Sequence, residues 1–354
     1  MRRRLFIFIL AAFAVLTGCE RRPLEYGNAT LDLRLNLRLN VRVNGELQEL
    51  PEPEMMRVMF FDPETFDLVT ESYLPAGGGR VSLPPGRYKF IAYNFDTEAT
   101  LLRNDRNYYS IEAYTNEVSQ ALKNSTINAI RYAMNGGTKA DSDEEASTWE
   151  RALMQIQENP VIYEPDHLFT SHQDIEVLNI DGDQVIEADA ETIIETWKIS
   201  VKIKNEQYMA SARALLTGQI ASNFIGLPKE EGKTDTDVTL MFDMKADSFA
   251  DPESEDGTSD MIVGQFNTFG KNPNVYSRLW LTIIIKTVGG DTIEWHRDIT
   301  DEFFTEEAYE DQTIHIEDDT IIINPPDPSG GGSGNGGFQP GVDDWVEENI
   351  PIDI

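Results

Sequence analysis

The sequence predicts a mainly β protein made of two antiparallel β-sandwich domains with short helical insertions. Apolar and polar residues alternate without a fault from Leu31 to Val43, which is the period of a half-buried strand. A second alternation runs from Trp197 to Lys204. The rest of the second half offers strand-like runs separated by turn residues, and 354 residues are enough for two domains.

The N-terminus has the pattern of an export signal with a lipid attachment site. Three arginines precede an apolar run from Leu5 to Leu16, which is too short to span a bilayer as a helix but suits a signal peptide. Leu16-Thr17-Gly18-Cys19 follows and resembles the bacterial lipobox, in which the cysteine thiol takes a diacylglyceryl group. We expect residues 1–18 to be a lipoprotein signal peptide, Cys19 to be the lipidation site and residues 19–27 to be a tether.

Composition restricts the partners and the compartment. The chain has 29 Lys plus Arg and 62 Asp plus Glu, for a net charge of −33. This acidity argues against nucleic-acid binding, because phosphate recognition needs clustered basic residues. Cys19 is the one cysteine, so no intramolecular disulfide can form, and the exported chain must rely on its cores or on partners.

The alternation from Leu31 to Val43 predicts one strand, about 43 Å long, whose aliphatic face is buried in the first sandwich. We expect it to remain attached in the mature protein. Asn44-Gly45 and Gly77-Gly78-Gly79 predict turns. The stretch from Leu83 to Phe95 predicts a turn followed by a central strand that packs on both sides.

Two helices are expected in the first half. Asn116 can cap a helix that runs through Ile130. Ser147-Thr148-Trp149-Glu150 resembles a capping box for the second helix, which Asn159-Pro160 would end.

The strand pattern restarts near Asp181, so the domain boundary is expected within residues 181–190. This assigns residues 28–184 to the N-terminal sandwich and residues 185–324 to the C-terminal sandwich. Strand-like runs in the second half are Val238–Met244, Met261–Phe269, Leu279–Val288, Thr292–Ile299 and Thr313–Asn324.

Residues 325–354 form a Gly-rich linker and a C-terminal tail. The tail carries Trp345 and then alternates Ile350, Ile352 and Ile354 with other residues. A strand-like tail after a flexible linker suggests docking, either on its own second domain or on another chain.

We expect no catalytic, cofactor-binding or metal-binding residue, and therefore a protein that is not an enzyme. No His-Glu-x-x-His pair, nucleophile elbow, phosphate loop or dinucleotide fingerprint occurs. Asp166-His167 with His172-Gln173-Asp174 could make a weak metal site, although a structural loop is favoured. The acidic run Asp251–Gly257 lacks EF-hand spacing and is expected to be a solvated loop. The four histidines are His167, His172, His296 and His315.

Several short motifs, taken in their order along the chain, resemble a known family. They are Cys19-Glu20-Arg21-Arg22-Pro23-Leu24, Leu83-Pro84-Pro85-Gly86-Arg87-Tyr88, Glu164-Pro165-Asp166-His167-Leu168-Phe169, Leu216-Thr217-Gly218, Gly264-Gln265-Phe266-Asn267-Thr268-Phe269-Gly270 and Asp343-Asp344-Trp345. The chain resembles the fimbrillin-like lipoproteins of type V pili, especially the minor-subunit and anchor branch. It is also similar to an uncharacterised lipoprotein family of gut and oral Bacteroidia.

That resemblance implies two transthyretin-like β-sandwiches, an outer-membrane lipid anchor facing the cell surface, and fimbrial subunits as partners. In the family, stalk subunits lose their first strand to an Arg- or Lys-specific protease and accept a strand from another subunit. Anchor subunits keep the first strand. Here the loop Asn44–Met56 contains no Arg or Lys, although Arg42 and Arg57 flank it, which favours an anchor or accessory subunit.

A second function class stays open, namely a surface lipoprotein that binds glycans. Trp280, Trp295 and Trp345 could stack on sugars, although core packing is the better expectation for the first two. Neighbouring genes would discriminate, because fimbrial subunit genes favour the first class and sugar-transport or glycosidase genes the second.

Overall fold

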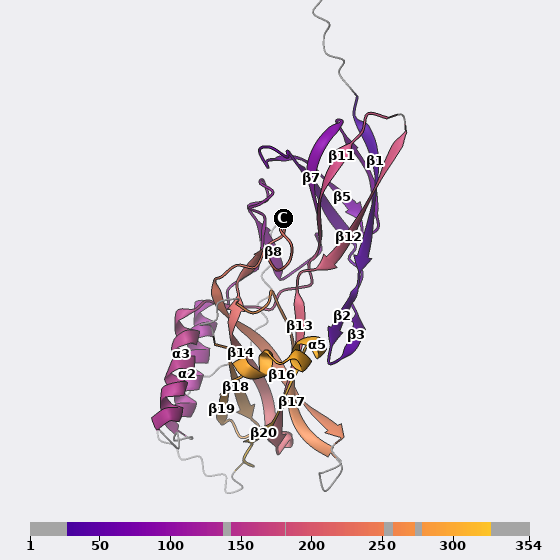
Figure 1. The fold of residues 1–354 in the computed structure, drawn as a ribbon. Helices are drawn as coiled ribbons and strands as arrows, with labels where there is room; N and C mark the ends of the chain where they lie inside the picture. The colour runs from indigo at the N-terminus through magenta and orange to yellow at the C-terminus, as the bar shows by residue number, and fades with distance from the viewer. Residues whose placement is uncertain (1–26, 137–142, 181, 251–257, 273–277, 327–354) are drawn as a thin grey trace, which may run out of the picture.

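The computed structural model describes residues 27–136, 143–180, 182–250, 258–272 and 278–326. Two large sheets follow one another along an elongated molecule, and two helices lie beside the lower sheet (Figure 1). The expected mainly β fold with short helical insertions is confirmed. The signal peptide, Cys19, the acidic run 251–257 and the tail from 327 onward lie outside the described residues.

The first sheet has seven strands in the order β5-β4-β7-β11-β12-β1-β6. Leu31 and Leu33 of β1 and Phe60 of β4 belong to one buried cluster, called here the first core. Because β1 and β4 stand far apart in the strand order but share this core, the sheet curls over itself into two layers. The strands are β1 Ala29–Arg38, β4 Met55–Phe61, β5 Leu68–Pro75, β6 Gly78–Leu83, β7 Gly86–Asn94, β11 Phe169–Val177 and β12 Asp183–Thr192.

The second sheet has the order β19-β18-β14-β16-β17-β13-β20, with β10 added beside β16. One face forms the second core, in which Trp197 stacks on Phe303 at 4.0 Å between ring centroids. Its two edge strands meet, since Arg297 Nη1 lies 2.7 Å from Asp318 Oδ1. The strands are β10 Val161–Ile162, β13 Glu195–Lys204, β14 Met209–Ile220, β16 Asp237–Ala250, β17 Thr258–Thr268, β18 Trp280–Thr287, β19 Thr292–Asp298 and β20 Thr313–Ile322.

Neighbouring strands are antiparallel as expected, except for three pairs. β1 runs parallel to β12, β13 runs parallel to β20, and β10 runs parallel to β16. Each of these pairs joins strands that are distant in sequence, so no hairpin turn fixes their direction. The expectation of wholly antiparallel sandwiches is corrected to this extent.

The helices begin at other residues than expected. α2 spans Gln120–Gly136, and the Ser119 hydroxyl, rather than Asn116, accepts a hydrogen bond from the Leu122 amide at 3.2 Å. α3 spans Asp143–Glu158, so the expected capping box at Ser147 lies inside the helix. The helix does end just before Asn159-Pro160, as predicted. Short helical segments in the second half are Glu206–Tyr208, α4 Thr300–Phe303 and α5 Glu306–Asp311.

α2 and α3 cover the second sheet, although they precede it in sequence. Ile130 of α2 and Ile156 of α3 pack with Leu215, Met241 and Ile284 on the sheet face opposite the second core. Burial on both faces explains why β18 is apolar along most of its length rather than alternating.

The chain passes between the two sheets more than once. A boundary between residues 184 and 185 would fall inside β12, and β10 of the second sheet precedes β11 and β12 of the first. A small sheet also mixes the halves, since β15 (Ser222–Phe224) pairs with β9 (Glu112–Thr115), which pairs with β8 (Thr100–Arg103). The division into two sequence-continuous domains therefore stays a prediction.

A buried cluster joins the two sheets and is called here the junction core. Ile91 and Tyr93 of β7 point away from the first core into this cluster. Ile220 and Phe269, from the second half of the chain, pack with them. β7 is thus buried on both faces, as its sequence predicted.

Candidate functional site: the seat of the N-terminal strand

β1 lies inside the first sheet, between β12 and β6. Leu31 pairs with Gln184 of β12 on one side and with Val81 of β6 on the other. The side chains of Leu31, Leu33 and Leu35 are buried in the first core, with exposed fractions of 0, 1 and 6%. The alternating sequence therefore forms a half-buried strand, as predicted. Its removal would leave β6 without a pairing strand and β12 paired only with β11.

The predicted single strand from Leu31 to Val43 is wrong in its length. β1 ends at Arg38, Leu39 belongs to no strand, and β2 (Asn40–Val43) pairs with β3 (Glu46–Glu49) instead. The Leu50 amide donates to the Leu39 carbonyl at 2.6 Å. Alternation continues across this break because one face of β2 is also turned toward protein, so the pattern alone cannot reveal the break.

Charged residues occupy the outer face of β1 and pair with β12. Arg38 Nη1 lies 3.1 Å from Glu191 Oε2, and Asn36 donates to Asp189 Oδ1 at 3.1 Å. Arg34 lies between Asp32 and Glu187. These exposed pairs contribute little stability each, but their order matches the register of the parallel pair.

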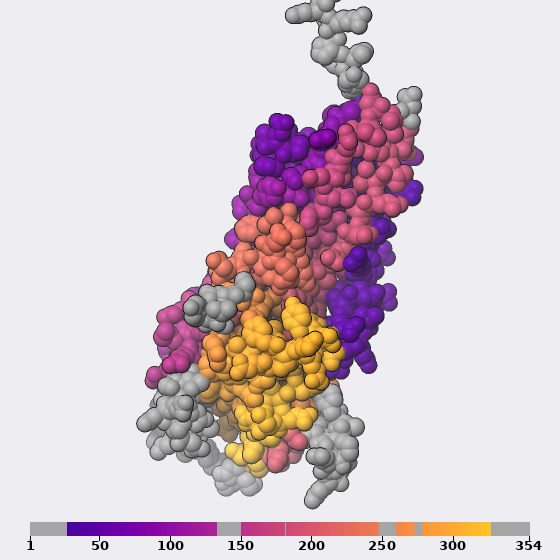
Figure 2. All heavy atoms as spheres, in the orientation of Figure 1, coloured from indigo at the N-terminus to yellow at the C-terminus, as the bar shows by residue number. Residues whose placement is uncertain are grey.

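The hairpin β2–β3 connects the N-terminal strand to the second sheet. The Gly45 amide donates to the Asp311 carbonyl at 3.0 Å, and Gln265 Nε2 donates to Gln48 Oε1 at 3.3 Å. In Figures 1 and 2 the indigo hairpin lies against the yellow segments around α5. The N-terminal segment therefore contacts both large sheets.

The basic side chains in this segment lie in regular structure. Arg34 and Arg38 belong to β1, and Arg42 belongs to β2. Arg57, just after the loop, is in β4 with a side chain only 11% exposed. It donates to Tyr93 Oη at 2.6 Å and to Asp105 Oδ2 at 2.8 Å, and it pairs with Glu71.

The histidine motif considered for metal binding has structural roles. His167 Nδ1 lies 3.1 Å from Thr192 Oγ1, and its Nε2 lies 3.1 Å from Thr196 Oγ1. Burial lowers the pKa of His167 to about 4, so the ring is neutral. Asp166 accepts hydrogen bonds from the Glu98 and Ala99 amides. Within the described ranges, no group of three His, Cys, Asp or Glu is arranged to hold a metal ion.

The tryptophans expected to pack in the core do so to different extents. Trp280 is 5% exposed. Trp295 is partly buried against the second core, and its Nε1 donates to Asp319 Oδ2 at 2.9 Å. Trp345 lies outside the described residues. No sequence pattern indicated the exposed aromatic pair of Tyr73 and Phe95, whose ring centroids lie 5.0 Å apart in an edge-to-face arrangement.

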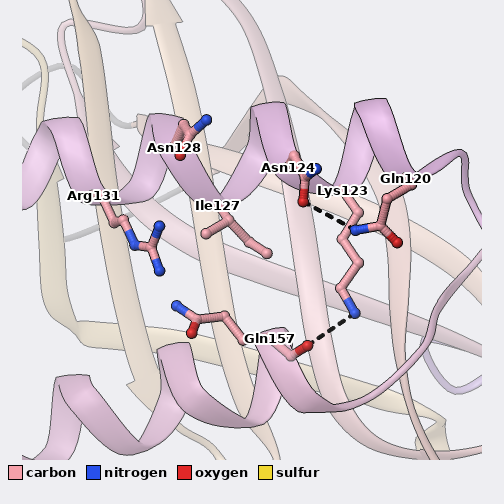
Figure 3. Close-up of a pocket in the computed structure, with 7 residues that line it drawn as sticks. All are labelled: Gln120, Lys123, Asn124, Ile127, Asn128, Arg131 and Gln157. Atoms are coloured by element: carbon pink, nitrogen blue, oxygen red, sulfur yellow. Dashed lines mark hydrogen bonds between the residues drawn. The ribbon is translucent and has the colours of Figure 1, made fainter.

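An open groove of about 360 Å³ lies between α2 and α3 (Figure 3). Lys123 closes one end by donating to the carbonyls of Gln157 and Asn159. The lining has amides and two basic side chains but no acid or histidine, so it offers no acid–base pair for catalysis. The lining residues are Gln120, Lys123, Asn124, Ile127, Asn128, Arg131 and Gln157. In the part of the chain that the structure describes, no helix is long and apolar enough to cross a membrane.

The fold and this site define a two-part β protein whose N-terminal strand is a structural part of its first sandwich. The chain belongs to the family described as a domain of unknown function, DUF5119, whose model matches residues 18–243.

Relatives extend this result over the whole chain. The chain is 24% identical over 380 aligned residues to a Bacteroides ovatus protein named "Putative fimbrium anchoring subunit Fim4B", covering 99% of this chain and 98% of that protein. It shares the fold of a "putative adhesin" from Bacteroides ovatus, with a TM-score of 0.54, 20% identity, and coverage of 88% of this chain and 98% of that one. The resemblance to fimbrial proteins seen in the motifs is confirmed.

Proposed function

We propose that this chain is a lipid-anchored accessory subunit of a cell-surface fimbrium, and that it acts as an anchor rather than as a polymerising subunit. Its partners would be the membrane, through acylated Cys19, and other fimbrial subunits. The full-length similarity to a protein named as a fimbrium anchoring subunit supports the assignment. The position of β1 inside the first sheet, between β12 and β6, is the observation that carries the anchor role.

The energetics of β1 favour its retention. Burying the side chains of Leu31, Leu33 and Leu35 contributes roughly 5–9 kcal/mol to the stability of the first sandwich. A typical domain has a net stability of about 5–15 kcal/mol. Loss of β1 would therefore unfold the first sandwich unless a strand from another chain replaced it.

The positions of the basic residues disfavour proteolytic removal of β1. A protease binds its substrate as an extended segment in an accessible loop, and the loop after β3 contains no Arg or Lys up to Arg57. Arg57 lies in a strand between β5 and β7, and its side chain is almost buried. Arg42 is exposed, but it is paired with Leu47 in a hairpin that contacts the second sheet.

N-terminal analysis of the protein from native cells tests the proposal. We expect an N-terminus at Cys19 that is blocked by acyl chains, with Leu31–Leu37 still present in the mature chain. Cys19→Ala is the matched variant and should leave the chain in the soluble envelope fraction. A mature N-terminus between residues 43 and 57 would overturn the anchor role, and an unmodified Cys19 in membrane-extracted protein would overturn the lipid anchor.

Glycan binding remains the second candidate, and the exposed Tyr73–Phe95 pair favours it. Exposed aromatic rings offer apolar faces on which sugars can stack. Trp280 is too deeply buried for that role. Genes for sugar transport or glycosidases beside this one would favour the glycan role, and genes for fimbrial subunits would favour the anchor role.

A further inference from the structure

Three segments gather at the end of the first sheet where β1 begins. The register places Ala29 opposite Leu83 and Thr30 opposite Asp183. The start of β1 therefore lies beside the turn between β6 and β7 and beside the turn between β11 and β12. In Figure 1 this is the upper end of the molecule, far from the second sheet.

Three aliphatic side chains at this end are exposed, and we call them the tip cluster. Leu178, Ile180 and Val185 have exposed fractions of 44, 48 and 46%. Turns of this kind usually carry Gly, Asn, Asp, Pro or Ser, so leucine and isoleucine in a protruding turn are unusual. None of the three belongs to a buried cluster of the described residues.

Gln184 fixes the base of the turn that carries the tip cluster. Its Oε1 accepts from the Leu178 amide at 2.8 Å, and its Nε2 donates to the Glu176 carbonyl at 2.7 Å. The aliphatic side chains therefore extend from an ordered base whose polar groups are partnered.

Two acidic residues beside the tip cluster, Glu176 and Asp183, have basic neighbours. Arg80 lies 2.7 Å from Asp183, and Arg87 faces Glu176 across neighbouring strands. The chain as a whole has 62 acidic and 29 basic residues. This end can therefore approach an anionic lipid surface with less repulsion than most of the molecule.

The tip cluster is also close to the proposed anchor along the chain. Thr30 follows Cys19 by eleven residues. Such a tether extends at most roughly 40 Å and spans roughly 18 Å as a flexible coil. A tether this short holds the upper end of the first sheet near the bilayer and gives weak contacts a high effective concentration.

We propose that Leu178, Ile180 and Val185 form a second membrane contact, in which their side chains enter the lipid surface beside the acylated Cys19. This inference rests on the proposed lipid anchor. The contact orients the molecule, with the first sheet at the membrane and the second sheet pointing away from it. Three aliphatic side chains do not hold a protein on a membrane by themselves, so the contact acts only in the anchored protein.

The test uses the mature acylated protein in vesicles of phosphatidylethanolamine and phosphatidylglycerol that contain a nitroxide-labelled phospholipid. Because Cys19 is the one cysteine and its thiol is acylated, Ile180→Cys introduces a unique thiol for an environment-sensitive fluorophore. Val288→Cys is the control, since Val288 is 56% exposed near the turn between β18 and β19 in the second sheet. We expect a blue shift and severalfold stronger quenching at position 180 than at position 288.

Flotation and the intact mass of the protein separate the two possible failures. If the protein is not acylated and does not float with the vesicles, the proposed anchor is wrong and the membrane contact falls with it. If the protein floats but position 180 is quenched no more than position 288, the anchor stands and the membrane contact is overturned. Leu178→Ser with Ile180→Ser should keep flotation and reduce the quenching of a label at position 185.

Discussion

Two partly buried ionisable residues, Glu164 and His167, lie in the connection between β10 and β11, where the chain returns from the second sheet to the first. Glu164 Oε2 accepts from the Asn267 amide at 3.0 Å. Burial, with a smaller contribution from nearby Asp243, raises the pKa of Glu164 to about 7. Burial, with a smaller contribution from Lys229, lowers the pKa of His167 to about 4. The two residues therefore respond to pH in opposite directions.

Glu164→Gln should stabilise the protein at pH 8 but not at pH 4. The pKa of Glu164 rises from 4.5 to about 7 on folding, so its contribution to stability is complete below pH 4.5 and is lost as the pH rises through 7. The uncharged amide keeps the acceptor for Asn267 without that loss. The expected gain at pH 8 is on the order of 3 kcal/mol, measured by urea unfolding.

His167→Gln provides the matched control. The pKa of His167 falls from 6.5 to about 4 on folding, so its stabilisation is complete above pH 6.5 and is lost as the pH falls through 4. Relative to wild type, this variant should therefore gain stability at pH 4 rather than at pH 8. The same pH profile for both variants would contradict the assignment of these pKa shifts to two separate, partly buried groups.

At the scale of elements, the sequence predicted which face of a strand is buried better than it predicted which strands pair. Alternation from Leu31 predicts a half-buried strand, and a local repeat contains that information. It does not indicate that β12, about 150 residues later, is the parallel partner, because side-chain period is independent of pairing. For the same reason the helices could be recognised, while their packing on the second sheet could not. The candidate functional site was predictable only in part. The alternation predicted β1 as a half-buried strand, but no sequence pattern indicates that Tyr73 and Phe95 meet on the surface.

Gly78→Ala should destabilise the first sandwich strongly. Gly78 faces Arg34 of β1 with φ at +102°, and an added Cβ would lie 2.0 Å from the Leu33 carbonyl oxygen. Either β1 must move or the backbone must change, and such strain costs about 1–3 kcal/mol or more. Gly77→Ala is the control, because nothing lies within 4 Å of its Cβ position. Equal thermal midpoints for the two variants would mean that β1 and β6 are not in close contact.

At the scale of the whole molecule, the junction core decides whether the two sheets behave as independent domains. It takes Met59, Phe61 and Ile91 from the first sheet and Ile220 and Phe269 from the second half. Dividing the chain into two domains at one sequence boundary leaves no place for these contacts between the two halves. Since these side chains are almost fully buried, separating the sheets would expose a large apolar surface, so we expect the sheets to unfold together.

Phe269→Ala should uncouple the two sheets. The ring is 1% exposed in the junction core, and its loss should cost about 3–5 kcal/mol while leaving the first and second cores intact. Tryptophan fluorescence reports on the second sheet, because no strand of the first sheet contains a tryptophan. Hydrogen exchange of β1 and β7 amides reports on the first sheet. In wild type the two probes should give one midpoint in urea.

In Phe269→Ala the two midpoints should separate, because each sheet keeps its own core but loses the contact that couples them. Phe266→Ala is the matched control, since Phe266 is equally buried but lies in the second core. It should lower the common midpoint without separating the probes, because the junction core is unchanged. Two midpoints in the wild-type protein would show that the sheets fold independently, and β2–β3 would then be a loose contact rather than a bridge between them.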